Sequence, residues 1–444
     1  MRYPNRRTGP GRGSSPVSFT TPRPASWQVC LQCGNEMVET DATIRCRECR
    51  GLLEVRHRRP ELAGPVLRAL FQTRCCTRHD TTASGVWRFR EIVLPGADVE
   101  PVTYPEGNTP LLYRPALAEW AGTPDLFLKH EGHNPTGSFK DRGMTVGMTQ
   151  ARRIGARMVG CASTGNTSAS LAAYAAQAGL PALVLVPSGK VALGKLAQSV
   201  GYGASVVAVR GDFDACLRLA DEASERLGIY LLNSVNPFRL EGQKTIVFEI
   251  LQQLGWEVPD WIVLPGGNLG NTAAFGKALE EARDWGLIDE LPRLAVVQAE
   301  GAAPFARGFA EGFKERHRVR AETVATAIRI GDPASWDRAV RAIRTTDGVV
   351  VSVPDAEILE AKSVIDRAGV GCEPASAASL AGLRRLAAAG TVSANARVVA
   401  VLTGHMLKDP DILLSGAGGH SAPIDEIDAS TEALEAAVGR IAGG

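Results

Sequence analysis

The sequence predicts an α/β protein built from two open, doubly wound parallel sheets. From about residue 120 onward, short apolar runs rich in β-branched residues alternate with Ala- and Leu-rich stretches of helical periodicity. Several of these runs are continuously hydrophobic, which is typical of parallel strands that helices cover on both faces. The runs are too numerous for one comfortable sheet, and 444 residues are too many for one small core. We therefore expect two α/β domains.

The expected strands follow one another along the chain with helical segments between them. They are Leu126–Leu128, Met158–Cys161, Ala182–Val186, Ser205–Val209, Ile229–Leu232, Trp261–Leu264, Leu294–Gln298, Val349–Val353 and Val398–Leu402. Helical periodicity is clear in Ser168–Ala178, Phe213–Leu227 and Ala273–Ala282. Beyond Gly418 the chain is glycine-rich and then weakly helical over Ser430–Ile441, which predicts a surface helix.

Composition excludes several classes of function. The formal net charge of +1 gives no overall field for nucleic acid or an anionic membrane. No apolar run approaches the roughly 20 residues that a membrane-spanning helix needs. Residues 1–26 carry arginines among Gly, Ser and Pro without an apolar core segment, so we expect a flexible basic tail and a cytoplasmic location.

Four of the nine cysteines form one pattern. Cys30 and Cys33 are followed, after twelve intervening residues, by Cys46 and Cys49. Two such pairs on tight turns can close a tetrahedron around Zn²⁺, so residues 27–60 are expected to be a zinc-ribbon-like segment with a structural metal. A small loop packed through reduced cysteines is the alternative. A closed four-thiolate site has no open position, so no catalysis is assigned to it.

Lys140 is the most informative single residue. It follows the Gly- and Pro-rich stretch Asn134–Phe139 and precedes an expected helix. A fold would hold an amine there rather than leave it solvated, and a desolvated lysine forms Schiff bases with carbonyl compounds such as pyridoxal phosphate. Alone, such a lysine is more often a surface charge, so other loops must supply its partners.

Three loops supply suitable partners at the carboxyl ends of expected strands, where open α/β sheets bind their ligands. Ser163–Ser170 leads into a helix whose free amide groups suit a carboxylate, although such a loop, taken alone, is more often ordinary helix capping. Gly266–Thr272 is a glycine-rich turn before another helix and suits a single phosphate monoester. Thr403 follows the last strong strand, where its hydroxyl would meet a ligand.

Taken together, these motifs resemble the fold type II pyridoxal-phosphate enzymes, which share the tryptophan synthase β-like architecture, and within them the threonine synthases. The resemblance covers about residues 27–444. It rests on Asn134–Gly143, Ser163–Ser170, Val191–Gln198, Asn233–Thr245, Gly266–Asn271, Gly371–Ser376 and Leu402–Pro410. With it we expect a larger cofactor-binding domain of residues 61–132 and 233–444, and a smaller inserted domain of residues 133–232.

The resemblance also implies a role for individual residues. Lys140 would carry the cofactor as a Schiff base beside Phe139, Asn166 would bind the cofactor's phenolic oxygen, and Thr403 would meet its pyridine nitrogen. The cofactor phosphate would lie on the loop Gly266, Gly267, Asn268, Leu269, Gly270 and Asn271. Substrate-binding groups would be Ser163, Thr164 and Thr167, with Asn233, Ser234 and Arg239 for the substrate's own phosphate, which a guanidinium suits bidentately.

The implied activity is that of a lyase of threonine biosynthesis. It would convert O-phospho-L-homoserine and water to L-threonine and phosphate, and the family expectation is a homodimer. Lys140 would act repeatedly as acid and base, which requires a lowered pKa.

Three residues depart from the family pattern and leave alternatives open. They are His133, Lys190 and Met406. His133 and Lys190 would add positive charge at the entrance of the expected active site. This charge would strengthen phosphate binding, or it would mark a paralogue that acts on another amino acid such as phosphoserine. A threonine dehydratase is a weaker alternative because it has no use for a second phosphate site. A nucleic-acid-binding protein with an inactive enzyme-like body is weaker still, given the charge balance and the intact Lys140, Asn166 and Thr403.

Overall fold

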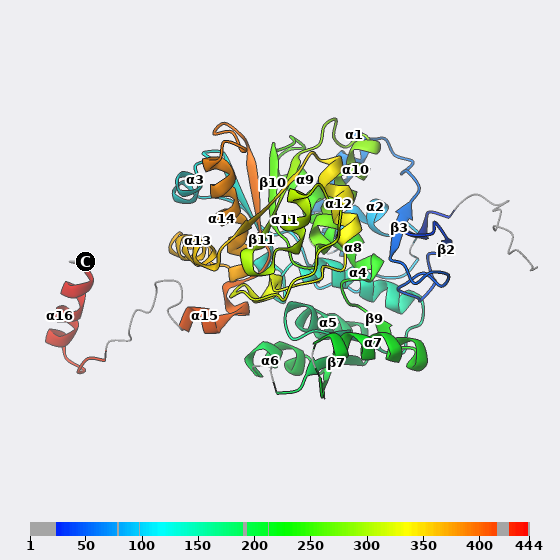
Figure 1. The fold of residues 1–444 in the computed structure, drawn as a ribbon, viewed down its shortest axis with the longest axis horizontal. Helices are drawn as coiled ribbons and strands as arrows, with labels where there is room; N and C mark the ends of the chain where they lie inside the picture. The colour runs from blue at the N-terminus through cyan, green and yellow to red at the C-terminus, as the bar shows by residue number, and fades with distance from the viewer. Residues whose placement is uncertain are drawn as a thin grey trace, which may run out of the picture.

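The computed structural model describes residues 24–77, 80–96, 98–189, 193–211, 213–414 and 426–442. Within these ranges the chain forms two mainly parallel sheets with helices on their faces and a small antiparallel sheet at one side (Figure 1). Each of the nine strands expected from the sequence is present, within two residues at either end. No helix in the described part of the chain has the length and apolar character that a membrane crossing requires.

The larger sheet has six strands in the order β12-β11-β10-β13-β5-β4. All neighbours are parallel except the edge pair β4 and β5. Its strands are β4 (Leu111–Tyr113), β5 (Leu126–His130), β10 (Trp261–Pro265), β11 (Arg293–Ala299), β12 (Val349–Val353) and β13 (Val398–Leu402). The short edge strand β4 was not expected, because three residues carry too little periodicity to recognise.

Helices cover both faces of this sheet, and the side chains of its strands divide between two cores. Along β10, Ile262 and Leu264 enter one core, whereas Trp261 and Val263 enter the other. The first core is shared with α1 (Gly64–Cys75), α2 (Arg90–Val93), α8 (Pro237–Gln243), α9 (Thr245–Gln253), α10 (Gly270–Asp284), α11 (Pro304–Ala310) and α12 (Trp336–Thr345). The second is shared with α3 (Pro115–Ala121), α13 (Asp355–Arg367) and α14 (Pro374–Ala388).

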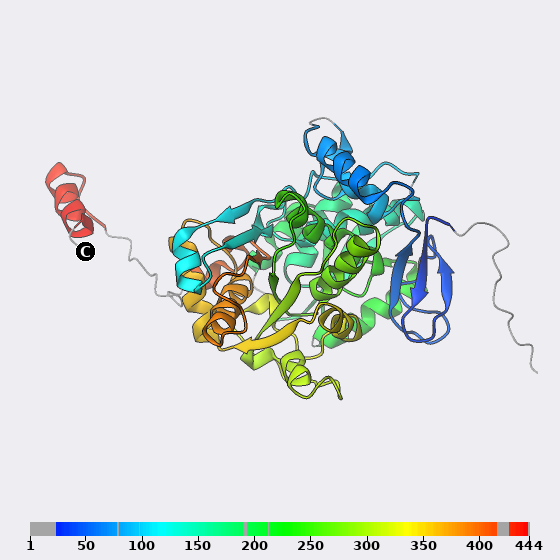
Figure 2. The same ribbon diagram turned by 90° about the horizontal axis from the view of Figure 1, so that it is seen from above.

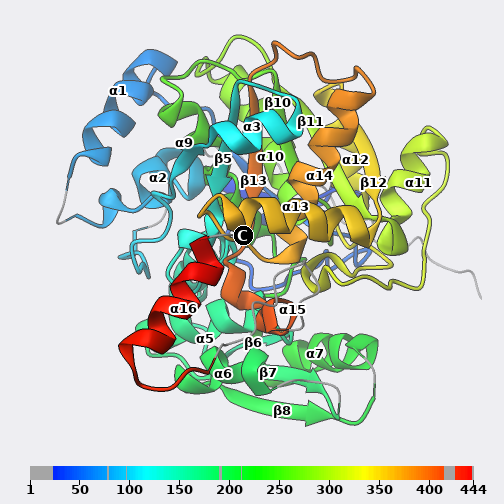
Figure 3. The same cartoon turned by 90° about the vertical axis from the view of Figure 1, so that its left-hand side faces the viewer.

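The smaller sheet has four parallel strands in the order β8-β7-β6-β9 (Figure 3). They are β6 (Val159–Ala162), β7 (Ala182–Pro187), β8 (Ser205–Val209) and β9 (Tyr230–Leu231). Together with α5 (Asn166–Ala178), α6 (Leu193–Gly201) and α7 (Phe213–Leu227) they are called the small unit below. The six-stranded sheet and the helices that cover its two faces are called the large unit.

Helix α4 (Lys140–Arg153) lies between the two units (Figure 1). Its Val146 enters the core of the large unit, while Met144 and Met148 enter the core of the small unit. A helix with apolar residues on both sides is buried on both sides, which explains why most of α4 is inaccessible to solvent. Lys140, its first residue, therefore lies at the junction of the two units.

The cysteine-rich segment forms a three-stranded antiparallel sheet in the order β2-β1-β3, at the side of the body (Figure 2). Its strands are β1 (Ser26–Cys30), β2 (Glu36–Val38) and β3 (Leu53–His57). These strands were not predicted, because their alternation of apolar and polar residues extends over only three to four positions. Near the other end, α15 (Pro410–Leu414) precedes the predicted surface helix, α16 (Thr431–Ala442), which is largely exposed.

Candidate active site

The loop before Lys140 is folded around one buried carboxylate. Asp141 accepts hydrogen bonds from the Thr136 amide at 2.7 Å and the Thr136 hydroxyl at 2.6 Å. The hydroxyl of Ser170, on α5, donates a third at 2.6 Å. Burial raises the pKa of Asp141 to about 6, although these hydrogen bonds oppose the shift. The loop is thus anchored to the small unit immediately beside Lys140.

The same loop is hydrogen-bonded to the end of β13. Ser138 and Gly404 form an antiparallel bridge, the Phe139 amide donates to the Thr403 carbonyl at 3.0 Å, and the His405 amide donates to the Gly137 carbonyl at 2.9 Å. These bonds join backbone segments that lie 264 or more positions apart in the sequence. They place Lys140 and Thr403 at the same edge of the large sheet.

The amine of Lys140 lies in an unusual electrostatic environment. Its Nζ is 4.0 Å from the centre of the Phe139 ring, and the side chain is largely shielded from water. Burial, followed by the nearby Arg239 guanidinium, lowers the pKa of Lys140 from 10.5 to about 7, while Glu373 acts in the opposite direction. An amine with this pKa can both accept and release a proton near neutral pH.

Glu373 joins Asn166 to Thr403. The Asn166 amide donates to the two Glu373 carboxylate oxygens at 3.0 and 3.3 Å, and the Thr403 hydroxyl lies 3.4 Å from one of them. Ser376, on α14, is 3.0 Å from the same hydroxyl. A Cβ on Gly404 would lie 2.5 Å from the Glu373 carboxyl, so any other residue there would displace this carboxyl from its partners. Burial raises the pKa of Glu373.

Neither Glu373 nor Ser376 was assigned a role from the sequence. Both lie in the stretch Gly371–Ser376, which was recognised as a motif without a function for any side chain. A carboxylate at a helix start is usually a cap, and nothing local shows that it faces residues more than 200 positions away.

Arg239 lies on α8 and is fully buried. Its Nη1 donates to the Leu232 carbonyl at 3.2 Å, but Nε and Nη2 have no partner among the described residues. Burial lowers the pKa of Arg239 to about 10. Close packing on α4 requires glycine, since a Cβ on Gly147 would lie 2.6 Å from Leu232 and 3.3 Å from Arg239. A buried cation without a counter-ion is the arrangement expected of an anion site.

Asn233, by contrast, is already engaged. Its side-chain oxygen accepts from the Ala162 amide at 3.1 Å, and its side-chain nitrogen donates to the Ala162 carbonyl at 3.0 Å. The carboxamide therefore holds the end of β6, just before the Ser163 loop. Ser234 is half-buried beside it.

The loop after β6 opens at the start of α5. Ser163, Thr164, Asn166 and Thr167 are all partly exposed, unlike the buried residues that follow them. Within the loop, the Ser163 hydroxyl accepts from the Gly165 amide at 3.3 Å. The first amides of this 13-residue helix are accordingly available to an anion together with nearby hydroxyl groups.

The glycine loop Gly266–Asn271 joins β10 to α10 and is tightly packed. A Cβ on Gly266 would lie 2.6 Å from Val296, and Leu269 adopts the left-handed conformation with φ of 61°. Asn268 is committed to structure, because its side chain accepts from the Ala334 amide at 3.2 Å. The side-chain oxygens of the buried residues Asn271 and Thr272 lack partners within the described chain.

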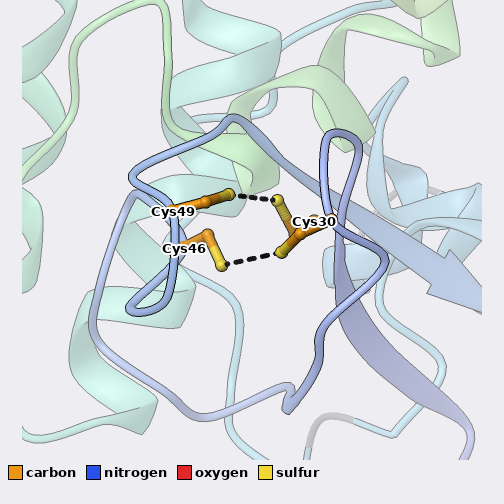
Figure 4. A group of neighbouring side chains, drawn as sticks. Cys30, Cys46 and Cys49 are labelled. Atoms are coloured by element: carbon orange, nitrogen blue, oxygen red, sulfur yellow. Dashed lines mark hydrogen bonds between the residues drawn. The ribbon is translucent and has the colours of Figure 1, made fainter.

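The four cysteines predicted to bind metal converge (Figure 4). The sulfurs of Cys30 and Cys49 are 3.4 Å apart, those of Cys33 and Cys46 are 3.6 Å apart, and all four lie within 4.8 Å of one another. A second group, His57, Glu241 and Glu281, has similar spacing, but the ammonium groups of Lys244 and Lys277 already pair with its carboxylates.

Two of the three departing residues lie near the site. His133 is exposed in the turn after β5, with its ring edge-to-face against His130 at 4.6 Å, and Met406 packs against Gly371. Lys190 lies outside the described residues, as does part of the stretch Val191–Gln198. One further cation was missed by sequence reasoning: the Lys408 ammonium donates to the Thr136 carbonyl at 3.0 Å and to Gln198 of α6 at 2.5 Å.

Comparison with known proteins agrees with this geometry. The family model described as "Pyridoxal-phosphate dependent enzyme" matches residues 102–404. Threonine synthase of Methanocaldococcus jannaschii is 46% identical over 386 residues, which cover 86% of this chain and 93% of the relative. Threonine synthase of Synechocystis is 51% identical over 73% of this chain and 83% of that protein.

The chain belongs to the threonine synthase family. Among solved structures, threonine synthase from Escherichia coli superposes with a TM-score of 0.67 at 20% identity, covering 92% of this chain and 94% of that one. Maize serine racemase superposes with a TM-score of 0.60 at 21% identity, covering 72% and 92%. These structures share the fold, and the family predicted from the motifs is confirmed.

Threonine synthases of this family are pyridoxal-phosphate enzymes, and the residues present fit that cofactor. Lys140 offers an amine that can lose its proton near neutral pH, next to the aromatic ring of Phe139. The glycine loop before α10 combines a helix start with the unpartnered side-chain oxygens of Asn271 and Thr272. These oxygens suit a protonated phosphate oxygen or a water molecule that bridges to the phosphate. Thr403, which follows β13 of the large sheet, and Asn166, at the start of α5 in the small unit, both contact the Glu373 carboxylate.

Proposed function

We propose that this protein is a threonine synthase that converts O-phospho-L-homoserine and water to L-threonine and phosphate. The observation that carries the proposal is Arg239, a buried guanidinium with two unpartnered nitrogens whose charge acts on Lys140. The glycine loop supplies a phosphate site for the cofactor, so a separate buried cation beside the reactive amine suits a second phosphate, the one on the substrate.

The proposed binding roles follow the charges of the substrate. The start of α5, with Ser163, Thr164 and Thr167, would receive the carboxylate, since its free amides and hydroxyls are partly exposed. Arg239 and Ser234 would receive the phosphate. Asn233 would act by fixing the Ser163 loop, because its own carboxamide is bonded to Ala162.

The chemistry needs one group that moves several protons. Bound pyridoxal phosphate supplies an electron sink that makes protons on the substrate's Cα and Cβ acidic. Lys140 takes these two protons and returns one to Cγ once the phosphate has left that carbon. Water then adds at Cβ, the proton it releases offsets the one taken up by the departing phosphate, and Lys140 returns the second proton to Cα. Its pKa of about 7 suits this repeated exchange, because neither protonation state is strongly favoured near neutral pH.

The second candidate function is a related activity, and two residues near the proposed site favour it. His133 and Met406 occupy positions that depart from the family pattern, so a paralogue acting on O-phosphoserine, or a dehydratase acting on threonine, would keep the same body. Arg239 argues against the dehydratase, whose substrate carries no phosphate, but it would serve O-phosphoserine as well.

The deciding experiment compares three substrates with the purified holoenzyme. Phosphate release is measured with O-phosphohomoserine and with O-phosphoserine, and keto-acid formation is measured with threonine. We expect kcat/KM for O-phosphohomoserine to exceed that for threonine, which lacks the phosphate, by at least about 10³-fold. It should exceed that for O-phosphoserine, which is one methylene shorter, by about 10–200-fold. A higher kcat/KM for either rival substrate would contradict the proposal.

Two wider features belong to the same proposal. The division into a larger domain (61–132 and 233–444) and an inserted domain (133–232) is supported by the strands of each sheet, which fall within these ranges. We also expect a homodimer in the cytoplasm. Light scattering coupled to size-exclusion chromatography checks the dimer.

A further inference from the structure

The two cysteine pairs are built on the same backbone turn. In the first, the Gly34 amide donates to the Cys30 carbonyl at 3.0 Å; in the second, the Arg50 amide donates to the Cys46 carbonyl at 2.9 Å. The residue after each pair is left-handed, with φ of 74° at Gly34 and 62° at Arg50. Arginine rarely adopts this conformation, so the second turn is held in place by its surroundings rather than by local preference.

The four sulfurs have the spacing of a metal site and not of disulfides. A disulfide requires sulfurs about 2.05 Å apart, whereas the Cys30–Cys49 and Cys33–Cys46 distances are 3.4 and 3.6 Å. Tetrahedral Zn²⁺ with Zn–S bonds of about 2.3 Å separates its sulfurs by about 3.8 Å. The Gln32 amide also points at the Cys30 sulfur, at 3.4 Å, in the manner of an outer-shell partner.

One side of this segment, which we call the knuckle (residues 30–52), is packed on the small unit. Ile44 is buried in the small unit's core, and Leu52 packs against it. Two ion pairs join the knuckle to α7: Arg45 lies 3.8 Å from Asp221, and Arg50 pairs with Glu225. The two arginines flank the second cysteine pair: Arg45 directly precedes Cys46, and Arg50 directly follows Cys49.

The strand that follows, β3, is packed on the large unit. Val55 enters the large unit's core, and Glu54 pairs with Arg341 of α12 at 2.7 Å. His57 lies 2.6 Å from Glu241 on α8, the helix that also carries Arg239. Only a few residues separate these contacts from those made by Leu52 and Arg50, so the knuckle connects the two units across its second cysteine pair.

We infer that Cys30, Cys33, Cys46 and Cys49 bind one structural Zn²⁺, and that the metal-closed knuckle fastens the small unit to the large unit through α7 and β3. The metal fixes both turns, because without it only weak contacts between thiols hold the four sulfurs together and nothing enforces the left-handed Arg50. The expected consequence is local: loss of zinc loosens α7 while the far side of the large unit stays unchanged.

The metal half of the inference is tested by metal content, without reference to activity. Holoenzyme purified under reducing conditions is analysed by inductively coupled plasma mass spectrometry, and metal-free protein is titrated with Zn²⁺ against a chromophoric chelator. We expect one zinc per chain, retained in the Cys75→Ser/Cys76→Ser double variant, whose exposed cysteines lie outside the cluster. Cys33→Ser, at an exposed ligand position, should lose it. Wild-type protein that neither contains nor takes up zinc overturns the inference.

The fastening half is tested by hydrogen–deuterium exchange of the zinc-loaded and chelator-stripped wild-type holoenzyme, so that it does not depend on a variant that fails to fold. Amides of α7 should exchange about tenfold faster or more after zinc removal, and re-addition of zinc should restore them. Amides of α13, on the opposite side of the large sheet, are the internal reference and should not change. If α7 exchanges equally with and without bound zinc, the metal does not fasten the units.

Discussion

The backbone amide of Phe139 donates a 3.0 Å hydrogen bond to the carbonyl oxygen of Thr403. Lys140 is the next residue in the chain, and Thr403 directly follows β13, one of the two middle strands of the large sheet. This bond, with its two neighbours, therefore holds together the two groups proposed to meet opposite ends of the cofactor.

Replacing Lys140 with alanine should abolish catalysis while preserving the fold. The side chain is the only proposed proton carrier, and general acid–base catalysis is worth about 10²–10⁴-fold by itself, so threonine formation should fall by at least that factor. Borohydride should fix the cofactor on the wild type but not on the variant, as judged by mass spectrometry of the tryptic peptide. Lys314→Ala, at an exposed lysine, is the control and should behave as wild type.

The proton equilibrium of Lys140 should be visible in the cofactor-free protein. Only the neutral amine adds to an aldehyde, so the rate of pyridoxal-phosphate capture should rise with a midpoint near pH 7, not near 10.5. Because the folded pKa is lowered, folding is penalised below about pH 7, and this penalty disappears as pH rises toward 10.5. Stopped-flow absorbance measures the midpoint.

Two charged residues shift the pKa of Lys140, and replacing each of them should move the pH midpoint of cofactor capture in opposite directions. Arg239→Met removes a cation that lowers the pKa, so the midpoint should move up; Glu373→Gln removes an anion that raises it, so the midpoint should move down. A midpoint that moves the same way in both variants would show that the environment of the amine is governed by something else.

Arg239 should contribute to substrate binding at the expense of stability. Losing charge-assisted hydrogen bonds of about 1.5–3 kcal/mol should raise KM for O-phosphohomoserine by roughly 10–150-fold in Arg239→Met. The same variant should melt at an equal or higher temperature, because it removes a buried, incompletely paired charge. An unchanged KM would show that the substrate phosphate binds elsewhere.

Arg142 is the matched control for that comparison. It is equally buried, but its guanidinium pairs with Glu131 at 2.7 Å and with Glu249 at 2.9 Å. Arg142→Met should therefore lose about 3–5 kcal/mol of stability by leaving two buried carboxylates without their partner. Urea unfolding of the two variants separates a functional arginine from a structural one.

Glu249 should be a main source of stability at neutral pH. It is fully buried and pairs with Arg88 at 2.8 Å, Lys129 at 2.6 Å and Arg142 at 2.9 Å. Burial opposes ionisation, but these three cations hold the pKa of Glu249 well below its ordinary value of 4.5. The stabilisation is therefore present above about pH 4.5 and is lost as pH falls through the lower, folded-state pKa.

Glu249→Gln should accordingly cost about 3–5 kcal/mol at neutral pH, and the gap from wild type should narrow in acid. Urea unfolding at several pH values measures both. Glu360→Gln, which breaks the exposed pair with Arg384, should cost less than about 1 kcal/mol and show no such narrowing. Equal effects of the two substitutions would contradict the role given to Glu249.

Much of the fold was recognisable from local pattern. Continuous apolar runs such as Val398–Leu402 predicted parallel strands, because a strand covered on both faces has no polar side. The loops after those strands could be grouped in advance, since parallel strands end at a common edge. Strands β1 to β3 were not predicted because polar and charged residues interrupt them, and β4 was not predicted because it has only three residues.

The sequence by itself determined the α/β class and the family and pointed to Lys140 as the candidate reactive amine, because strands, turns and motifs are properties of neighbouring residues. Only the tertiary structure decided which side chains are free to act. Asn233 and Asn268 are occupied by backbone groups, Glu373 reaches Asn166 from 207 positions away, and Arg239 keeps two nitrogens without partners. The physical reason is that hydrogen-bond pairing and burial depend on residues brought together by the fold, and local sequence carries no record of them.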